Sequence, residues 1–192
     1  MTISADDDAT PDAELIGRVR GGDTDAYAVL VRRHAPMAMR TAVLLGAGSD
    51  AEDVVQEALV KAYRTLDRFR ADRPFRPWLL RIVANETRNA HRGAVRRSAR
   101  EERATRSLPK ELIDPAEEVA DREGKEQLLA AVDRLPEAMG RVVVCRCLLD
   151  LDEATTAVVL GLPRGTVKSR LSRGLRRLRE DLGTTTERVD HA

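Results

Sequence analysis

The sequence has few aromatic residues, little cysteine and no long apolar run. Aromatic residues make up 3% of its 192 residues, and its two cysteines are Cys145 and Cys147. Two cysteines do not form a disulfide framework, and two residues apart on a helix they point to opposite sides, so they cannot easily share a metal. We therefore expect both to be small buried or half-buried residues, and we expect no metal site and no cofactor.

Signals for membranes and for common enzyme classes are also missing. No apolar segment is long enough to cross a bilayer, and the N-terminus lacks the basic-then-apolar pattern of a signal peptide, so we expect a cytoplasmic protein without membrane insertion. The sequence contains no His-Glu-x-x-His motif and no glycine-rich phosphate loop. Its histidines are scattered, at His34, His91 and His191. We expect no catalytic residues and no enzyme.

What is present is charge, arranged in blocks. Charged residues make up 34% of the chain, and the formal net charge is only +1. The segment 64–100 nevertheless holds eleven arginines against three acids, and 164–181 holds seven bases against two acids. Two separated basic blocks in a neutral chain fit two contact zones on a polyanion. The composition favours small helical bundles and hence an all-α fold. The segments described next divide it into two small helical domains joined by a flexible linker, with a helix-turn-helix in the second.

The first expected domain spans 12–92, after a disordered acidic tail at 1–11. Asp12 to Arg20 should form a short helix, and Asp23 or Thr24 should cap a longer one that bends or restarts at Pro36. Ser49-Asp50-Ala51-Glu52 has the pattern of a capping box. The helix after it should bury one continuous face, made of Ala51, Val54, Val55, Ala58, Leu59, Ala62, Tyr63 and Leu66.

The opposite face of that helix carries Asp53, Gln56 and Glu57. Acids in a first helical turn are favoured by the helix dipole, which is a purely structural explanation for the cluster. The same compact acidic and amide patch would also suit a basic partner surface. Spacing alone does not separate the two interpretations.

The segment 63–92 combines aromatic residues with arginines. Four of the five aromatic residues of the chain, Tyr63, Phe69, Phe75 and Trp78, lie in its first sixteen positions, interleaved with arginines. Aromatic faces can stack on unpaired bases while guanidinium groups hold the adjoining phosphates, which suits single-stranded nucleic acid. An ordinary helical core with a solvated arginine face is the alternative.

A new helix should follow this loop, with Pro77 as its first residue. Asn85 and Asn89 should share one face with Arg81, Arg88 and Arg92. Asparagine is a poor helix former, so two on one basic face indicate contacts with bases or backbone. Two exposed asparagines without a role are the alternative.

Residues 93–124 should form the linker, since no apolar periodicity survives there. The second expected domain spans 125–183, with a tail at 184–192. Within it, a short helix capped by Asp152, a turn at Gly161-Leu162-Pro163 and a basic helix from Arg164 to about Arg179 follow the helix-turn-helix plan, in which the second helix enters the major groove of DNA. A basic helix that closes a four-helix bundle is the alternative.

Two motifs resemble a known family. DAEDVVQEALVKAYRTLDRFR…FRPWLLRIVANETRN followed by LGLPRGTVKSRLSRGLRRLRE is similar to the bacterial RNA polymerase sigma factors of the sigma-70 family, extracytoplasmic-function (ECF) group. The resemblance covers roughly 12–92 and 125–182. It departs from the family pattern at Asn89, where aspartate is frequent, and at Pro163, where serine is common.

The resemblance implies a role for each candidate site. The patch Asp53, Gln56 and Glu57 would dock on the clamp helices of the largest subunit of core RNA polymerase, and the second domain on the polymerase flap. Single-stranded DNA of the minus-10 promoter element would meet Phe69, Arg70, Phe75, Trp78, Arg81, Asn85, Arg88 and Asn89. Duplex DNA of the minus-35 element would meet Arg164, Thr166, Lys168, Ser169, Ser172, Arg173 and Arg176. Membership also implies an anti-sigma factor and a nucleoid-associated location when bound to polymerase.

The main alternative to a sigma factor is a stand-alone helix-turn-helix transcription regulator. Such a protein would bind duplex promoter DNA by itself, as a dimer, and would need no polymerase. The aromatic and arginine loop around 69–78 argues against it, because a duplex-only binder has no need for a stacking platform.

Overall fold

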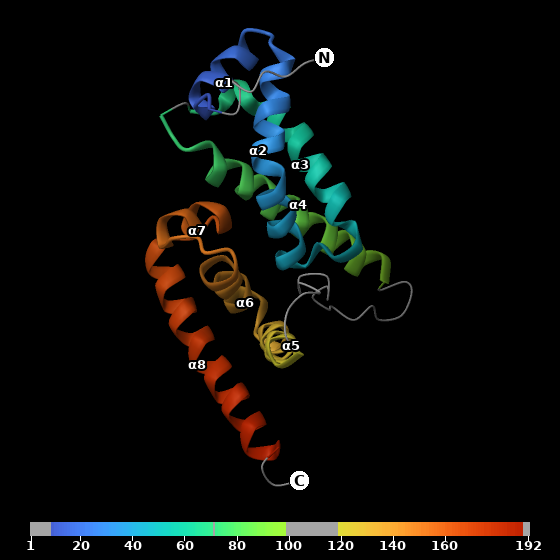
Figure 1. The fold of residues 1–192 in the computed structure, drawn as a ribbon, viewed down its shortest axis with the longest axis vertical. Coiled ribbons are helices and arrows are strands. Elements are labelled where there is room, and N and C mark those ends of the chain that lie inside the picture. The colour runs from blue at the N-terminus through green and yellow to red at the C-terminus, as the bar shows by residue number, and fades with distance from the viewer. Residues whose placement is uncertain (1–8, 71, 99–118, 190–192) are drawn as a thin grey trace.

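The computed structural model describes residues 9–70, 72–98 and 119–189, and within these ranges it contains helices, turns and loops but no strand (Figure 1). This confirms the all-α fold. The helices are α1 (Asp12–Arg20), α2 (Thr24–Ala42), α3 (Ala51–Thr65), α4 (Phe75–Ser98), α5 (Val119–Arg134), α6 (Glu137–Val143), α7 (Glu153–Leu160) and α8 (Arg164–Val189). Short π turns follow α2 (Val43–Ala47) and α6 (Val144–Leu148), and 3-10 turns occupy Gly48–Asp50 and Leu66–Arg68.

Helices α1 to α4 form the N-terminal group. Asp23 caps α2 as expected, since its Oδ1 accepts hydrogen bonds from the backbone N–H groups of Asp25 (3.0 Å) and Ala26 (3.1 Å). A restart at Pro36 is wrong, because α2 runs through this residue as one helix. The lost hydrogen bond is outweighed by packing on both sides of the proline, where Val29 and Leu30 before it and Ala38 and Ala42 after it are buried.

The capping box at 49–52 is also wrong. Gly46 and Gly48 adopt positive φ angles of 92° and 58°, which turn the chain into a 3-10 turn that leads directly into α3. The carbonyl of Gly48 then accepts the N–H of Ala51, and the Ser49 hydroxyl lies 3.4 Å from Asp50 rather than capping the helix. On α3 itself, the expected inner face is buried except at Leu59, which is half-buried, and at Tyr63, which is 45% exposed.

Helix α4 begins two residues earlier than expected. Pro74 precedes Phe75, and Pro77 lies within the first turn, where its missing N–H has no intrahelical partner to lose. The helix continues to Ser98, and α5 already begins at Val119. Both ends of the expected linker are therefore helical, and its middle, 99–118, lies outside the described residues.

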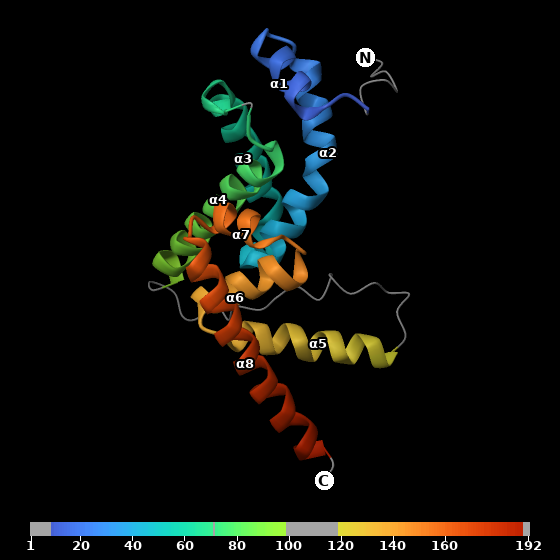
Figure 2. The ribbon, with the colours of Figure 1, turned by 90° about the vertical axis from the view of Figure 1, so that its left-hand side faces the viewer.

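Helices α5 to α8 form the C-terminal group, and α7, the turn at 161–163 and α8 make the expected helix-turn-helix. Helix α8 extends ten residues beyond the expected end and takes up most of the expected tail, with 190–192 outside the described residues. Its apolar stripe continues to Leu182, and Arg134 of α5 pairs with Asp181 at 3.6 Å. Figure 2 shows α8 running away from α7 toward the end of the molecule.

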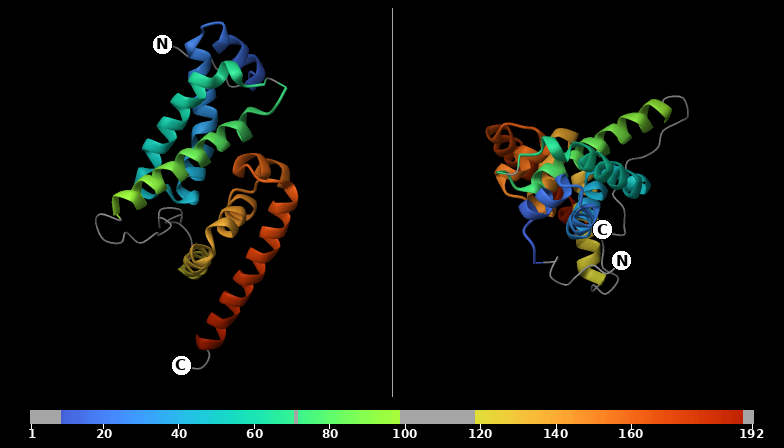
Figure 3. Two further views of the ribbon diagram at one scale, coloured as in Figure 1. Left: turned by 180° about the vertical axis from the view of Figure 1, so that it is seen from behind. Right: turned by 90° about the horizontal axis from the view of Figure 1, so that it is seen from above.

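The two groups pack against each other and share a hydrophobic core. Figure 3 shows them side by side from behind. Leu80 and Ala84 of α4 join one buried cluster with Val144 and Leu160 from the C-terminal group. Two arginines reinforce the contact by donating to backbone carbonyls across it, Arg40 to Leu148 (2.9 Å) and Arg141 to Ala84 (3.3 Å). The sequence pattern predicted two helical groups but not this shared core.

Candidate nucleic-acid interface

The acidic patch lies on the outer side of α3. Asp53, Gln56 and Glu57 are all exposed, on the side opposite the buried residues Val54 and Val55. The helix periodicity thus brings the three side chains together as predicted.

A groove beside this patch was not predicted from the sequence. It is a hollow of about 590 Å³ between α2 and α3, lined mainly by apolar side chains, including Val31, Met39 and Val60. Two exposed hydrophobic residues, Val60 and Tyr63, lie along it. Tyr27 also lines the groove, and its hydroxyl donates to the carbonyl of Leu59 (2.5 Å). Burial raises the pKa of Tyr27 to about 12. The signal that could have revealed the groove is Val60, an apolar residue on the polar side of α3.

The expected stacking platform is not an exposed one. Phe69 and Phe75 are 5% and 3% exposed, and their rings meet edge to face at 5.7 Å inside the core of the N-terminal group. Neither ring offers a free face to a base, so direct stacking by these two residues is a wrong prediction for this arrangement. Trp78 is half-buried with its ring centroid 4.9 Å from that of Phe69. Burying both phenylalanines is favoured because each removes a large apolar surface from water.

Arg70 stays exposed at the tip of the loop, where it pairs with Asp72 at 2.8 Å. This hydrogen bond holds the pKa of Asp72 below its usual range, although the carboxylate is fully exposed. Exposed pairs of this kind contribute little to stability, so Arg70 can exchange Asp72 for a phosphate at low cost.

A polar hollow of about 240 Å³ lies next to Trp78, where α3 and α4 meet. Its walls include Arg68, Trp78, Arg81 and Asn85, together with Lys61 and Thr65 of α3. The sequence predicted Trp78, Arg81 and Asn85 as site residues. It included Arg68 only as one of the interleaved arginines and did not single out Lys61 or Thr65. Helix α3 and the turn after it bring all three to the same place.

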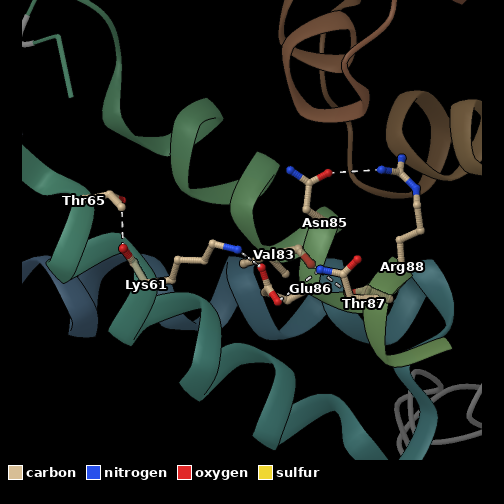
Figure 4. A network of polar contacts seen from close by, with 8 residues as sticks. Lys61, Thr65, Val83, Asn85, Glu86, Thr87 and Arg88 are labelled. Carbon is tan, nitrogen blue, oxygen red and sulfur yellow. Dashed lines mark hydrogen bonds and ion pairs between the residues drawn. The ribbon is translucent and has the colours of Figure 1, made fainter. Parts of the chain in front are cut away.

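The polar face of α4 is ordered by short-range contacts (Figure 4). Arg88 donates to the side-chain oxygen of Asn85 (3.1 Å), and both side chains lie on the side that faces the C-terminal helices. Glu86 points the other way, where it pairs with Lys61 of α3 at 2.6 Å and accepts from Asn89 at 3.4 Å. The two asparagines, one turn apart on α4, therefore bond to different partners.

The C-terminal helices partly cover this side of α4. Helix α7 packs along α4, and the guanidinium of Arg81 lies against Gly161 in the turn between α7 and α8. Arg88 lines a hollow of about 300 Å³ together with Arg141 of α6 and Leu162 and Arg170 from the C-terminal turn and α8. The residues predicted to meet one promoter element are thus in contact with the unit predicted to meet the other.

The helix-turn-helix is held by the cap and the turn that the sequence indicated. Asp152 Oδ1 accepts from the N–H of Thr155 (2.6 Å), and this backbone hydrogen bond lowers the pKa of Asp152. Gly161 adopts φ +64°, a left-handed conformation that favours glycine and lets α8 turn away from α7. Val167 is fully buried and fixes the first turn of α8 against the core.

The outer face of α8 is basic and accessible. Its exposed members are Arg164, Lys168, Ser169, Ser172, Arg173 and Arg176, with Thr166 half-buried beside them. Ser169 and Arg173 each donate to a backbone carbonyl of the preceding turn, at 3.2 Å, so both side chains lie along the helix surface. Lysine, arginine and serine on one exposed helix face are the side chains that reach base edges and phosphates.

The cysteines differ more than expected. Cys145 is fully buried, and burial raises its pKa to about 12, whereas Cys147 is exposed rather than half-buried. Among the described residues, no group of three or more histidine, cysteine, aspartate or glutamate side chains could hold a metal ion. In the same part of the chain, no helix is both long and apolar enough to span a bilayer.

Comparison with known proteins shows where the chain belongs. Residues 30–97 match the model of sigma-70 region 2, and residues 125–178 match that of sigma-70, region 4. The chain is 32% identical to the ECF RNA polymerase sigma-E factor of Escherichia coli strain K12, over 84% of this chain and 89% of that protein. It belongs to the ECF group of the sigma-70 family.

Further relatives agree with this assignment. The sigma-E factor of Haemophilus influenzae is 29% identical over 84% of this chain and 90% of that protein. The structure of CnrH in complex with the cytosolic domain of CnrY has a TM-score of 0.67 and 28% identity, covering 90% of this sigma factor and 97% of CnrH. The sigma factor RpoE from Bartonella quintana, solved with the anti-sigma factor NepR, shares the fold with a TM-score of 0.66 at 24% identity, covering 80% and 94% of the two chains.

Proposed function

We propose that this sigma factor binds core RNA polymerase, recognises promoter DNA at a duplex minus-35 element and a melted minus-10 element, and directs transcription initiation. The observation that carries the proposal is the presence in one chain, and in this order, of a region 2 match and a region 4 match. A sigma factor of this kind acts by binding, without catalysis of its own, and works in the cytoplasm on the nucleoid.

Polymerase binding is assigned to Asp53, Gln56 and Glu57. Their exposure on α3 supports a docking role on the basic clamp helices of the largest polymerase subunit. Exposed opposite charges guide association and set orientation more than they add affinity. Region 4 makes the second contact in this proposal, on the polymerase flap.

Recognition of the melted minus-10 strand is assigned to the hollow beside Trp78 and to α4. Arg68, Trp78, Arg81 and Asn85 line the hollow, so an unpaired base could be held between an aromatic face and amide or guanidinium donors. Arg70 on the loop and Arg88 and Asn89 farther along α4 are assigned to phosphate and base-edge contacts. Phe69 and Phe75 take a different role from the one expected, since they support Trp78 from inside the core.

Recognition of the minus-35 duplex is assigned to α8. The residues are Arg164, Thr166, Lys168, Ser169, Ser172, Arg173 and Arg176. They occupy the solvent face of the second helix of a helix-turn-helix, which is the face that enters a major groove.

Binding both elements at once requires the two helical groups to separate. The elements are centred about 25 base pairs apart, or about 85 Å of B-form DNA at 3.4 Å per base pair. In the arrangement described here α7 lies on α4 and shares a core with it. We therefore assign the packed arrangement to the sigma factor before it engages a promoter.

A regulatory protein partner is proposed from a structural analogy. CnrH was solved in complex with the cytosolic domain of CnrY. By analogy we propose that an anti-sigma factor binds this chain, with the apolar groove between α2 and α3 as an accessible surface.

The test is reconstitution with purified core RNA polymerase. We expect the wild-type chain to co-elute with core polymerase and to direct initiation from a discrete start site on genomic DNA. Asp53→Arg should abolish co-elution and leave the helical content intact, since it reverses charge at an exposed position. Arg173→Ala serves as the matched variant, with core binding retained and binding to the promoter duplex weakened.

The outcomes separate the two functional classes. Co-elution of Asp53→Arg at the wild-type level would remove the patch assignment. If the wild-type chain ignored core polymerase but bound duplex DNA alone, a stand-alone helix-turn-helix regulator would replace the sigma factor.

A further inference from the structure

Helix α1 lies outside the segment that matches sigma-70 region 2, which begins at residue 30. It nevertheless contacts the start of the loop that joins α3 to α4, the minus-10 loop. That loop leaves α3 through the 3-10 turn Leu66–Arg68, and the chain becomes extended at Phe69 (φ −70°, ψ 133°). Within the turn, the backbone N–H of Phe69 donates to the carbonyl of Leu66 (3.0 Å). The carbonyls at the end of such a helix need partners from elsewhere in the protein.

Arg20, the last residue of α1, supplies those partners. Its Nη2 donates to the carbonyls of Leu66 (2.9 Å), Asp67 (3.4 Å) and Phe69. A cation is favoured at a helix C-terminus, where the free carbonyls concentrate negative charge. One guanidinium group from a segment 46 residues earlier thereby fixes the point at which the chain leaves the helix and enters the loop.

The apolar side of α1 packs in the same buried cluster as the residues at the two ends of this loop. Leu15 and Ile16 are 0% and 1% exposed, and together with Val19 they belong to one buried cluster with Phe69 and Phe75. The two phenylalanines mark the start of the loop and its return into α4. Both ends of the loop therefore belong to the buried cluster that α1 helps to form.

Asp12, the first residue of α1, connects this helix to α2 near the end of the loop. Asp12 contacts two residues of α2, with Oδ1 2.5 Å from Nη1 of Arg33 and Oδ2 2.9 Å from Nε2 of His34. The His34 ring packs against Phe75, with 5.2 Å between the ring centroids. Arg20 at one end of α1 thus contacts the entrance of the loop directly, and Asp12 at the other end is linked to its exit through His34.

We propose that α1 is a brace for the minus-10 loop and that Arg20 is a positioning residue for recognition of the melted strand. Arg20 itself does not touch DNA. It holds the backbone at 66–69, and this places Arg68 and Arg70 and, through Phe69, Trp78. The proposal rests on the function proposed above, since it concerns the geometry of that same site.

The experiment compares Arg20→Ala with Arg18→Ala in the full chain bound to core polymerase. Arg18 lies on the same helix but pairs with Asp23 at the α1–α2 turn, at 2.9 Å. The probes are a promoter fragment around the mapped start site, pre-melted by mismatches at the minus-10 element, and the intact minus-35 duplex. We expect Arg20→Ala to bind the pre-melted probe about tenfold more weakly, the loss that corresponds to one charge-assisted hydrogen bond. Arg18→Ala should bind it like wild type.

Two further readouts distinguish positioning from general destabilisation. Core co-elution and minus-35 binding should be unchanged in Arg20→Ala, and hydrogen exchange should accelerate at the amide of Phe69, which donates to Leu66 at 3.0 Å. Arg20→Lys keeps the charge but not the planar fork, so it should restore part of the binding.

Equal affinity of Arg20→Ala and wild type for the pre-melted probe would overturn the brace while leaving the sigma-factor function intact. A uniform loss of core, duplex and pre-melted binding in both Arg20→Ala and Arg20→Lys would overturn it as well, since that pattern describes unfolding. If the wild-type chain itself failed to bind core polymerase, the proposed function would fail first.

Discussion

Gly174 offers the sharpest test of how α8 is positioned. It lies in the middle of α8 where the helix crosses α6, and it is buried. A Cβ atom added there would lie 2.8 Å from Cγ2 of Val143 and 3.7 Å from Cβ of Met139. Carbon atoms in contact normally lie about 3.5–4.0 Å apart, so Gly174→Ala forces a shift between the two helices.

The expected cost combines two opposing effects. Alanine is favoured over glycine within a helix by about 1 kcal/mol. Overpacking a core typically costs about 1–3 kcal/mol, and Val143 is a short branched side chain, 2% exposed, that cannot swing away. We therefore expect a net loss of about 0–2 kcal/mol in the free energy of unfolding. Gly183→Ala is the control, since a Cβ at Gly183 in the same helix meets nothing within 4 Å, and it should be neutral or stabilising.

Urea unfolding followed by circular dichroism measures the difference between the two variants, and binding to the minus-35 duplex reports the displacement of α8. The double variant Gly174→Ala with Val143→Ala removes the clashing methyl group. Its loss in the free energy of unfolding should therefore be smaller than the sum of the losses in the two single variants. If Gly174→Ala raised the unfolding midpoint as much as Gly183→Ala does, the close approach of α6 and α8 would not exist as described.

Three further predictions address the cap, the thiols and the contact between the helical groups. Asp152→Ala should lower the melting temperature, because the N–H of Thr155 loses its acceptor. Since the pKa of Asp152 is lowered on folding, its contribution is present above the unfolded value of 3.8 and is lost as the pH falls through the folded one, so wild type and variant should converge in melting experiments at low pH. Iodoacetamide should modify Cys147 in the native protein and reach Cys145 only on unfolding, as peptide mass mapping would show; early labelling of Cys145 would contradict its burial. Ala84→Arg should separate the two helical groups and raise the radius of gyration in X-ray scattering at unchanged helicity, and an unchanged radius would contradict the shared core.

The sequence was most informative where one helix face decides the structure. The period of α3 placed Val54 and Val55 inside and Asp53 outside, and Asp152 and Gly161 marked the limits of α7. These features depend on neighbours within one or two turns of a helix, so a local pattern suffices to find them.

Predictions failed where a distant segment overrides a local preference. Pro36 remains helical because packing on both sides holds it, and the Ser49 box gives way to a turn set by Gly46 and Gly48. The same reason applies to the loop, because Phe69 and Phe75 are buried in a cluster with residues of α1 and α2, which lie far earlier in the chain. The hydrogen bonds from Arg20 to that loop join residues 46 or more positions apart, so no local sequence pattern indicates them.

The hydrophobic core shared by the two helical groups could not be predicted from the sequence either. Leu80 and Ala84 fit the apolar stripe of α4 as ordinary members, and nothing in their spacing says which helix covers them. Only the fold shows that α7 does.

The position of Trp78 gives the protein a built-in optical probe. It is the only tryptophan in the chain, and it stands between the buried pair of phenylalanines and the polar hollow on α4. Indole emission depends on local polarity and on stacking, so the fluorescence excited at the red edge of the protein spectrum comes from one location. Arrival of an unpaired base, loosening of the loop and withdrawal of α7 from α4 would each change that signal in the unlabelled protein, in real time and without an added dye.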